Sequence, residues 1–415
     1  MIAVPRHIIA RAAAAGFQGA FRSVCAARKM SSLGSKSPAH GGKLIDRFIS
    51  CEKERAEQVR SCNGLSFELT ERQACDVELI TTGAFSPIEG FMNEDTWLGV
   101  LKDMRIPGSK TLFGLPVVLD THRQDIVPGK RVALTFHGQV LAVMEVESRW
   151  RPDKPLECKH AYGSTSLEHP GARLVAMERG PFYLGGKLFG HGIAKRIYPS
   201  TTPAQLRARL PADKDVVVFQ CRNPIHRAHY ELFIRALDAP NVGKDAVVLV
   251  HPTCGPTQED DIDGVTRFRT YEVLKAELNN PRVHWAYLPY SMHMAGPREA
   301  IQHMIMRKNY GCTHFIIGRD MAGCKSSLTG KDYYGPYDAQ DMARAHCKEL
   351  GMQIVPSLDL VYTVEEGYVT EEVATAKKLT IQKLSGTEFR KRLRGGEEIP
   401  EWFAFKSVVK ALRDN

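Results

Sequence analysis

Apolar and polar positions follow two different rhythms along this chain. Between residues 115 and 150, β-branched apolar runs are interrupted by turn pairs such as Pro128-Gly129 and His137-Gly138. Runs of this kind, bounded by turn residues, predict strands rather than helices. We therefore expect residues 46–198 to form a β-rich scaffold made mostly of short strands and turns.

From about Thr201 the pattern changes to short apolar runs followed by amphipathic segments. Apolar runs at 214–219, 245–252, 313–318 and 352–357 predict strands, and segments at 226–238, 296–311 and 336–351 predict helices. This alternation predicts a parallel, doubly wound α/β sheet over residues 199–355. Ligands of such sheets bind beyond the carboxyl ends of the strands.

The last segment, residues 356–415, is expected to form a small α/β domain. Within it, Ser385 and Glu388 have the spacing of a capping box, which marks the start of a helix. Gly395-Gly396 follows a short basic stretch and predicts the end of that helix.

The net charge of +9 is concentrated at the N-terminus. Residues 1–45 contain no acidic residue and seven basic ones, namely Arg6, Arg11, Arg22, Arg28, Lys29, Lys36 and Lys43, which leaves only +2 for the remainder. An Arg- and Ala-rich segment without acids is typical of an organelle-targeting presequence, and a disordered basic tail is the alternative. We expect a mitochondrial protein, with plastid as the alternative, or cytoplasm if this segment is not a signal.

The other compositional signals exclude several classes of protein. The near-neutral remainder argues against nucleic-acid binding, and no apolar run approaches the roughly 20 residues that span a bilayer. The ten cysteines are scattered without zinc-site spacing, so we expect reduced thiols and no protein-bound metal.

Candidate chemistry lies at the first predicted strand end of the α/β region, in "FQCRNPIHRAHYEL". His226 and His229 share one face of a helix start, where backbone N–H groups and the helix dipole favour an anion. Arg222 adds a permanent charge with forked donors that suit a tetrahedral oxyanion. One alternative is that the two histidines have no function, as is usual for an isolated His-x-x-His pair. The other is that they form half of a zinc site, for which the sequence offers no companion ligands.

The same stretch resembles the Gln-x-Arg-Asn-Pro-x-His-x-x-His signature of ATP sulfurylases, a branch of the His-x-x-His nucleotidylyltransferases. Further blocks resemble this family, among them "ERQACDVELITTGAFSPIEGFM" of a PUA-like domain, "GCTHFIIGRDMAG" and "DYYGPYDAQ". The similarity runs from about Gly64 to Val409 and is closest to fungal-type members, without their C-terminal kinase-like domain.

The resemblance implies adenylyl transfer from ATP to sulfate, giving adenosine 5′-phosphosulfate and pyrophosphate in the activation of sulfate. The implied catalytic residues are Cys221, Arg222, Asn223, His226 and His229. The implied sulfate ligands are Gln220, Arg222 and the backbone N–H of Ala322. The implied nucleotide-binding residues are Gln220, Cys221, Arg222, Asn223, His226, His229, Gly318, Arg319, Asp320, Met321 and Leu360, with the two histidines on the β- and γ-phosphates and Leu360 at the adenine.

The chemistry needs no general base, because sulfate is already ionised at neutral pH. We expect direct in-line attack on the α-phosphate, without a covalent intermediate, assisted by hydrogen-bond donors and by Mg²⁺ carried on the triphosphate. Cys221 could suggest an activated thiolate, but we interpret it as a backbone and packing residue.

Several features depart from the family pattern or imitate other motifs. The family's Gly-x-Thr-Lys reads Gly255-Pro256-Thr257-Gln258, and Ser357–Asp359 lacks the usual aromatic and basic residues, which weakens the assignment of Leu360. In "GRDMAGCKSS" Cys324 replaces the lysine of a phosphate loop, and we expect the acidic run Glu259–Asp263 to be an exposed loop before a helix.

Three alternatives remain open from the sequence. They are another His-x-x-His adenylyl- or cytidylyltransferase, a catalytically silent homologue, and a PUA-like nucleic-acid-binding protein. By analogy with the family we expect a homo-oligomer, with a homodimer as the specific hypothesis.

Overall fold

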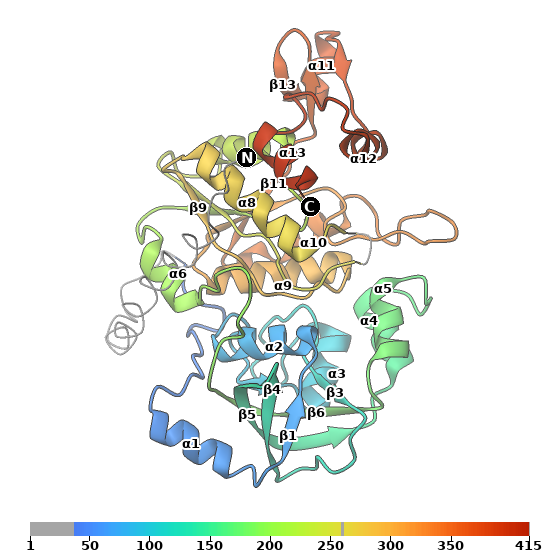
Figure 1. Cartoon of the computed structure of the whole chain (residues 1–415). Coiled ribbons are helices and arrows are strands. Elements are labelled where there is room, and N and C mark those ends of the chain that lie inside the picture. The colour runs from blue at the N-terminus through green and yellow to red at the C-terminus, as the bar shows by residue number, and fades with distance from the viewer. Residues whose placement is uncertain (1–36, 259–260, 415) are drawn as a thin grey trace, which may run out of the picture.

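The computed structural model describes residues 37–258 and 261–414, apart from the side chain of Thr387, and the chain forms three parts in sequence order (Figure 1). An N-terminal part is followed by a central part with a parallel sheet and by a small C-terminal part. The predicted targeting segment falls mainly on residues 1–36, which lie outside the described residues.

The N-terminal part is built on a six-stranded sheet with the order β1-β4-β5-β6-β2, in which β3 also pairs with β6. Its strands are β1 (Ser66–Glu68), β2 (Gly90–Phe91), β3 (Leu119–Thr121), β4 (Arg131–Phe136), β5 (Gln139–Trp150) and β6 (Phe182–Gly190). The His137-Gly138 pair turns between β4 and β5, as the sequence predicts, and both residues have positive φ angles.

Helices make up more of this part than the sequence analysis expected. They are α1 (Glu52–Arg60), α2 (Glu71–Thr81), α3 (Glu94–Asp103), α4 (Lys154–Tyr162), α5 (Pro170–Arg173) and the π-helical turn η2 (Leu174–Glu178). The expectation of mostly short strands and turns was therefore wrong in detail. A capping box that the sequence analysis missed starts α2: the Thr70 hydroxyl accepts from Gln73 N, and the Gln73 side chain accepts from Thr70 N.

The central part is the predicted parallel sheet. Its strands are β7 (Val216–Phe219), β8 (Val247–Val250), β9 (Val283–Trp285), β10 (His314–Ile317) and β11 (Gln353–Pro356), in the order β11-β10-β7-β8-β9. All four neighbouring pairs are parallel. The chain runs outward from β7 to β9 on one side and from β10 to β11 on the other. The order of the strands thus reverses between β7 and β10, the position at which doubly wound sheets bind ligands.

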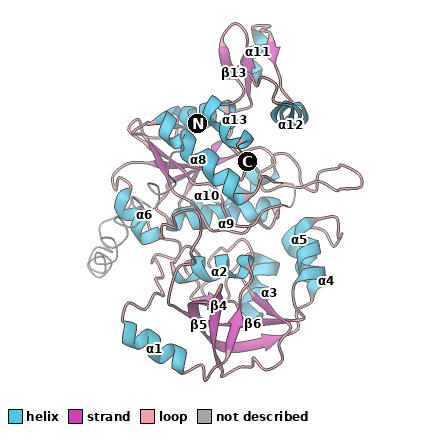
Figure 2. Ribbon diagram, in the orientation of Figure 1, coloured by secondary structure: helices cyan, strands magenta, loops and turns pink. Residues whose placement is uncertain are grey.

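Helices cover both faces of this sheet (Figure 2). They are α6 (Pro203–Arg209), α7 (Arg227–Arg235), the 3₁₀ turn η3 (Ala236–Asp238), α8 (Gly264–Leu278), α9 (Gly296–Asn309) and α10 (Asp338–Leu350). Side chains of β7 alternate between two cores: Val218 packs in a core with Met304 of α9, and Val217 in a core with Phe233 of α7. This period of two is what a strand buried on both faces requires.

Two elements of the central part were not predicted from the sequence, namely α6 and β9, whereas α8 is the helix expected after the acidic run. Asp263 caps α8, since its Oδ1 accepts a hydrogen bond of 3.0 Å from Thr266 N. The acidic run before the helix therefore ends in a cap, while Glu259 and Asp260 lie outside the described residues.

The C-terminal part contains a three-stranded antiparallel sheet in the order β13-β12-β14, which agrees with the predicted small α/β domain. Its elements are β12 (Leu360–Thr363), β13 (Gly367–Thr370), α11 (Glu371–Ala376), β14 (Ile381–Gln382), α12 (Gly386–Gly395) and α13 (Lys406–Arg413), which packs on α8. Ser385 caps α12 and Gly396 ends it with φ +68°, but the capping box is only half formed because Glu388 pairs with Arg392 at 2.9 Å.

An arginine at the start of α9 joins the central part to the N-terminal part. Arg298 donates to the carbonyl oxygens of Gly114, Leu101 and His160 at 3.0, 2.8 and 2.8 Å, and to that of Val100. Three of these carbonyls lie in the last turns of α3 and α4, which carry negative partial charge. Burial lowers the pKa of Arg298 to about 10, so it stays charged at neutral pH.

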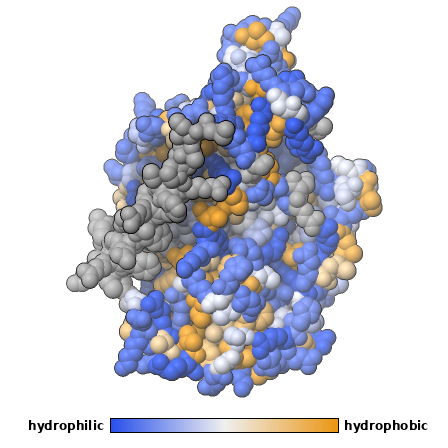
Figure 3. Space-filling view, in the orientation of Figure 1, coloured by the Kyte–Doolittle hydropathy of each residue, from blue (hydrophilic) through white to orange (hydrophobic). Residues whose placement is uncertain are grey.

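The surface formed by the described residues is mostly polar. Figure 3 shows hydrophilic residues over most of the visible face, with apolar ones in small groups. Among the described residues, no helix combines the length and apolar character needed to cross a bilayer.

Candidate active site

The site is organised by two turns at one edge of the central sheet. Strand β7 ends at Phe219 and continues into Gln220–Pro224, and its neighbour β10 ends at Ile317 and continues into Gly318–Ala322. Because β7 and β10 are parallel, both turns lie at the same edge. The structure thus brings together the two predicted groups, Gln220–Asn223 and Gly318–Met321.

A buried arginine holds the backbone after β7. Arg267 of α8 donates to the carbonyl oxygens of Arg222, Thr253 and Gly255 at 2.9, 3.2 and 3.3 Å. Tyr271 of the same helix donates its hydroxyl to the carbonyl of Asn223 at 3.1 Å. Helix α8 therefore fixes the direction in which the turn presents its side chains, a role that the sequence analysis did not assign.

Gln220 and Cys221 are packed against this framework. Gln220 Nε2 donates to Thr253 Oγ1 at 3.3 Å and to Met292 Sδ, a weak acceptor, at 3.9 Å, which leaves its carbonyl oxygen for other partners. The Cys221 thiol is buried 3.8 Å from the Tyr271 hydroxyl, and burial raises its pKa to about 12. It is therefore a neutral thiol at physiological pH, as expected of a packing residue.

Arg222 carries the positive charge of the turn into a pocket of about 740 Å³. Its Nη1 atom lies 3.3 Å from Asp261 Oδ2 and 3.2 Å from Met294 Sδ. The adjacent Asn223 is exposed. The guanidinium is the most direct candidate in this turn for binding an oxyanion.

The pocket has walls from both the N-terminal and the central parts. Of the predicted residues, only Arg222, Asp320 and Met321 line it, together with Arg72 of α2 and Met292. Arg72 donates to the carbonyl of Met292 at 3.0 Å and contacts the Ser291 hydroxyl. The sequence analysis missed Arg72 because a single arginine in a helix carries no signal of its own.

A buried carboxylate shapes the segment between Met292 and Gly296. Glu299 accepts hydrogen bonds of 2.9 Å from both His293 N and Ala295 N, which stabilises left-handed backbone at Met294 with φ +60°. Gly296 has φ +51°, and a Cβ there would lie 2.7 Å from the ring of Tyr334. The close approach explains the glycine and places Met294 against Arg222.

His226 and His229 lie at the start of α7, but neither lines the 740 Å³ pocket. Their rings stack with centroids 3.7 Å apart, and His226 also stacks on Phe403 of the C-terminal part at 5.5 Å. The first amide of the helix, Arg227 N, donates to the carbonyl of Phe403 at 3.0 Å. One predicted anion-binding N–H is thus already bonded to protein.

Both imidazoles are neutral in this environment. Burial lowers the pKa of His226 to about 4, and burial together with the neighbouring His226 lowers the pKa of His229 well below its usual value. The buried Nδ1 of His229 has no hydrogen-bond partner among the described residues. A phosphate oxygen would supply a partner at this position.

The turn after β10 contains the predicted sulfate donor, the backbone N–H of Ala322. Asp320 and Ala322 have φ of +55° and +54°, and the carbonyl of Ala322 accepts from Gly296 N at 3.0 Å. The N–H of Ala322 has no acceptor among the residues that the structure describes. The Arg319 side chain is 57% exposed, and its Nε atom lies 3.5 Å from Asp320 Oδ2. It is therefore free to reorient.

The remaining sequence features have plain structural explanations. Leu360 is the first residue of β12 and is half-buried. Cys324 is buried and Lys325 pairs with the exposed Asp332 at 3.4 Å, so the "GRDMAGCKSS" stretch is not a phosphate loop. Among the described residues, no group of three or more potential metal ligands occurs.

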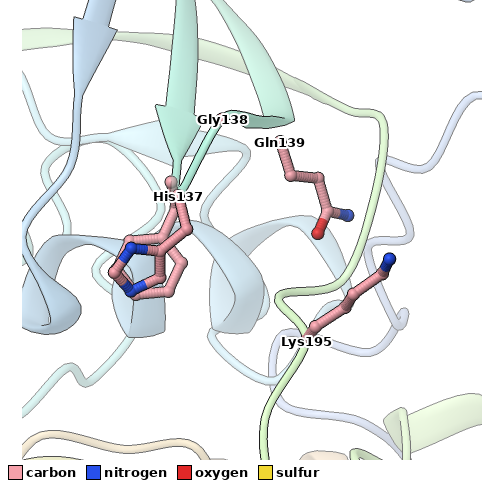
Figure 4. A pocket seen from close by; sticks show the side chains of 5 residues that line it. His137, Gly138, Gln139 and Lys195 are labelled. Carbon is pink, nitrogen blue, oxygen red and sulfur yellow. The ribbon is translucent and has the colours of Figure 1, made fainter.

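A second pocket, of about 290 Å³, lies at the turn between β4 and β5 and contains none of the predicted residues. Gln139 and Lys195 lie on one side of it and the His137 ring on the other (Figure 4). Gln139 donates to the carbonyl of Ile193 at 3.1 Å. The pocket's lining residues all belong to the N-terminal part and none to the strand ends of the central sheet.

Comparison with known proteins gives consistent matches over most of the chain. A family model described as ATP-sulfurylase matches residues 199–415, and a PUA-like domain model matches residues 37–190. The "Sulfate adenylyltransferase" of Phaeosphaeria nodorum is 41% identical over 394 residues, which cover 91% of this chain and 67% of the relative. The protein of the same name from Saccharomyces cerevisiae is 39% identical over 390 residues, covering 91% and 75%.

One solved structure has a similar fold over the same extent. It is a hexameric APS kinase from Thiobacillus denitrificans, with a TM-score of 0.71 and 23% sequence identity. The match covers 91% of this chain and 68% of that chain. At this identity the match supports the fold.

Proposed function

Because this chain belongs to the ATP-sulfurylase family, we propose that it transfers the adenylyl group of ATP to sulfate, producing adenosine 5′-phosphosulfate and pyrophosphate. The observation that supports this most directly is the position of Arg222. Its guanidinium enters a pocket from the strand end where the order of the parallel sheet reverses.

The sulfate would bind at Arg222 with help from Gln220 and the N–H of Ala322. Arg222 offers forked charged donors, and Ala322 N–H has no acceptor among the described residues. Beyond its bond to Thr253, Gln220 Nε2 donates only to Met292 Sδ, a weak acceptor that a sulfate oxygen would replace. None of these groups is a base, and sulfate needs none because it is already a dianion. The residues therefore act by orienting the nucleophile and by offsetting repulsion between two anions.

The triphosphate would lie along the edge formed by Gly318–Met321 and the start of α7. His226 and His229 donate to the β- and γ-phosphates, Arg319 turns from Asp320 toward the same charges, and Leu360 lies toward the adenine. Attack of a sulfate oxygen on the α-phosphorus forms the new P–O bond while the bond to the leaving pyrophosphate breaks, in line. The electron pair of that bond leaves on pyrophosphate.

The donor set also fits a nucleotide that arrives with Mg²⁺. The turn side chains are arginine, asparagine and histidine, which bind the phosphate oxygens that a metal leaves free, and the ion itself would neutralise part of the triphosphate charge. The described residues contribute hydrogen-bond donors at this edge and not a carboxylate cage.

The test is an assay of purified protein in both directions. We expect pyrophosphate release with ATP and sulfate, and ATP formation from adenosine 5′-phosphosulfate and pyrophosphate. Selenate and molybdate should support nucleotide consumption, because they share the tetrahedral dianion. Absence of turnover in both directions would refute the proposal.

Replacing Cys221 with serine tests the direct mechanism. We expect the variant to keep activity within about threefold, because the buried neutral thiol only fills space, and a small loss of thermal stability from the poorer packing of a hydroxyl. Steady-state rates and melting temperature check this. Complete loss of transfer with sulfate binding intact would instead indicate a covalent role.

Two further properties extend the proposal beyond the site. We infer a mitochondrial location from the acid-free basic residues 1–45, which a fusion of this segment to a fluorescent protein would test. We also infer a homodimer, which light scattering of the purified chain would test.

A further inference from the structure

The acid that pairs with Arg222 comes from the loop before α8. Asp261 Oδ2 lies 3.3 Å from Arg222 Nη1 and also accepts a hydrogen bond of 3.2 Å from Gln258 N. The Asp261 side chain is only 9% exposed, compared with 23% for Arg222. The carboxylate is therefore largely shielded from solvent where it meets Arg222, although Asp261 is not itself among the residues that line the pocket.

No other described acid takes the same position at this guanidinium. Glu299 also lies in the vicinity, but both of its oxygens accept backbone N–H groups, from His293 and Ala295. The remaining contact of Nη1 is Met294 Sδ, a weak acceptor without charge. Among the described residues, Asp261 thus supplies the anionic partner of Arg222.

We propose, on the basis of the proposed function, that Asp261 is a built-in competitor for the anion site, whose carboxylate occupies Arg222 until substrate sulfate displaces it. A carboxylate and a sulfate present the same kind of oxygen pair to a guanidinium, so both use the same donors. The pair offsets the charge of Arg222 while no anion is bound, so every anion that binds there must first displace the carboxylate.

Displacement has a measurable signature that distinguishes it from simple repulsion. If an anion must break the Asp261–Arg222 pair, the cost is the same for a monoanion and a dianion of equal shape. If instead Asp261 stays in place and repels the ligand, the free-energy cost for a dianion is twice that for a monoanion. Sulfate and perchlorate are both tetrahedral and provide this comparison.

The experiment uses Asp261→Asn in the full chain. Asparagine keeps an oxygen for the Gln258 N–H but loses the charge. We expect the KM for sulfate and the inhibition constant of perchlorate against sulfate both to fall by the same factor, roughly three- to tenfold, as for loss of a partly buried ion pair. The KM for ATP should change by less than twofold.

The matched control is Asp332→Asn. Asp332 lines the same pocket and pairs with Lys325, so the variant changes the net charge equally without touching Arg222. We expect the KM for sulfate and the inhibition constant of perchlorate each to change by less than twofold. Asp261→Glu, which retains the charge, should give values closer to those of the wild type than Asp261→Asn does.

Three results would overturn the inference. They are an unchanged or raised KM for sulfate in a folded Asp261→Asn protein, a fold-change for sulfate that is the square of the change for perchlorate, and an equal effect of Asp332→Asn. Failure of the proposed function looks different, because the wild type itself would then show no transfer. Calorimetric titration with sulfate and perchlorate tests Asp261 without turnover.

Discussion

Replacing Arg222 with glutamine is expected to lower kcat/KM for sulfate by about 10³-fold. The guanidinium is the charged donor that the turn after β7 places in the pocket, and removal of one such donor from charge stabilisation typically costs 10²- to 10³-fold. Glutamine retains neutral donors but not the charge or the fork. Initial rates over a range of sulfate concentrations measure the effect.

The control for this variant is Arg344→Gln in α10. Arg344 is 58% exposed, pairs with Asp341 and does not line the pocket, so the substitution removes the same charge outside the proposed site. Arg222→Lys should recover only part of the loss, because an ammonium group lacks the planar fork. An Arg222→Gln protein with more than a tenth of wild-type kcat/KM would contradict the assignment of Arg222 to sulfate.

The second large effect is expected for His226→Ala, which should lower kcat roughly 10²-fold in both directions. If His226 donates to the phosphates that depart as pyrophosphate, the same contact binds pyrophosphate in the reverse reaction, so both rates depend on it. The histidine does not line the 740 Å³ pocket, and a purely structural role would leave the chemistry largely intact. Rapid-quench measurement of one turnover in each direction separates these cases.

His346→Ala is the matched control, because His346 lies on the surface of α10 beside Glu349. It should leave both rates within about twofold of the wild type. A loss in only one direction for His226→Ala would be inconsistent with a contact to pyrophosphate.

The pH dependence of stability provides an independent check on His226. Its pKa falls from 6.5 in the unfolded chain to about 4 in the fold, because burial disfavours the imidazolium. The unfolded chain therefore binds more protons between these values, and the stability that the neutral imidazole contributes is present above pH 6.5 and lost as the pH falls toward 4. The full loss is on the order of 3 kcal/mol.

Denaturant unfolding between pH 7.5 and 5 tests this sign. Wild type should lose more free energy of unfolding over that interval than His226→Ala does. The difference between the two proteins isolates His226 from the other buried histidines, whose pKa values are also lowered, among them His251 and His303. If the free energy of unfolding changed equally with pH in the two proteins, the His226 imidazole would not be shielded from solvent.

The sequence predicted those features whose causes lie close together in the chain. The strand, turn and helix around Gln220–His229 are contiguous, so apolar runs and turn residues identified them. Helix α8 was expected only as the helix after the acidic run, and nothing local in the sequence indicates that its Arg267 and Tyr271 hold the turn after β7. Local patterns therefore located the site's edge but not the contacts that support it.

The pocket itself could not be predicted, because its walls come from distant segments. Among the lining residues, Arg72 and Met292 are 220 positions apart, and Arg222 and Met294 are 72 positions apart. Single residues of common types give no local signal of such contacts. The position of His226 and His229 beside Phe403, away from the pocket lining, likewise depends on the C-terminal segment folding back on α7.

The contacts of Arg298 determine which piece of the chain can carry this chemistry. A central part separated from residues 37–198 would leave this buried cation without the carbonyls of Val100, Leu101, Gly114 and His160, and the pocket without the wall that contains Arg72. The parallel sheet is consequently not a portable module. When this enzyme is split, grafted or recombined, the N-terminal and central parts would have to be exchanged together as one unit.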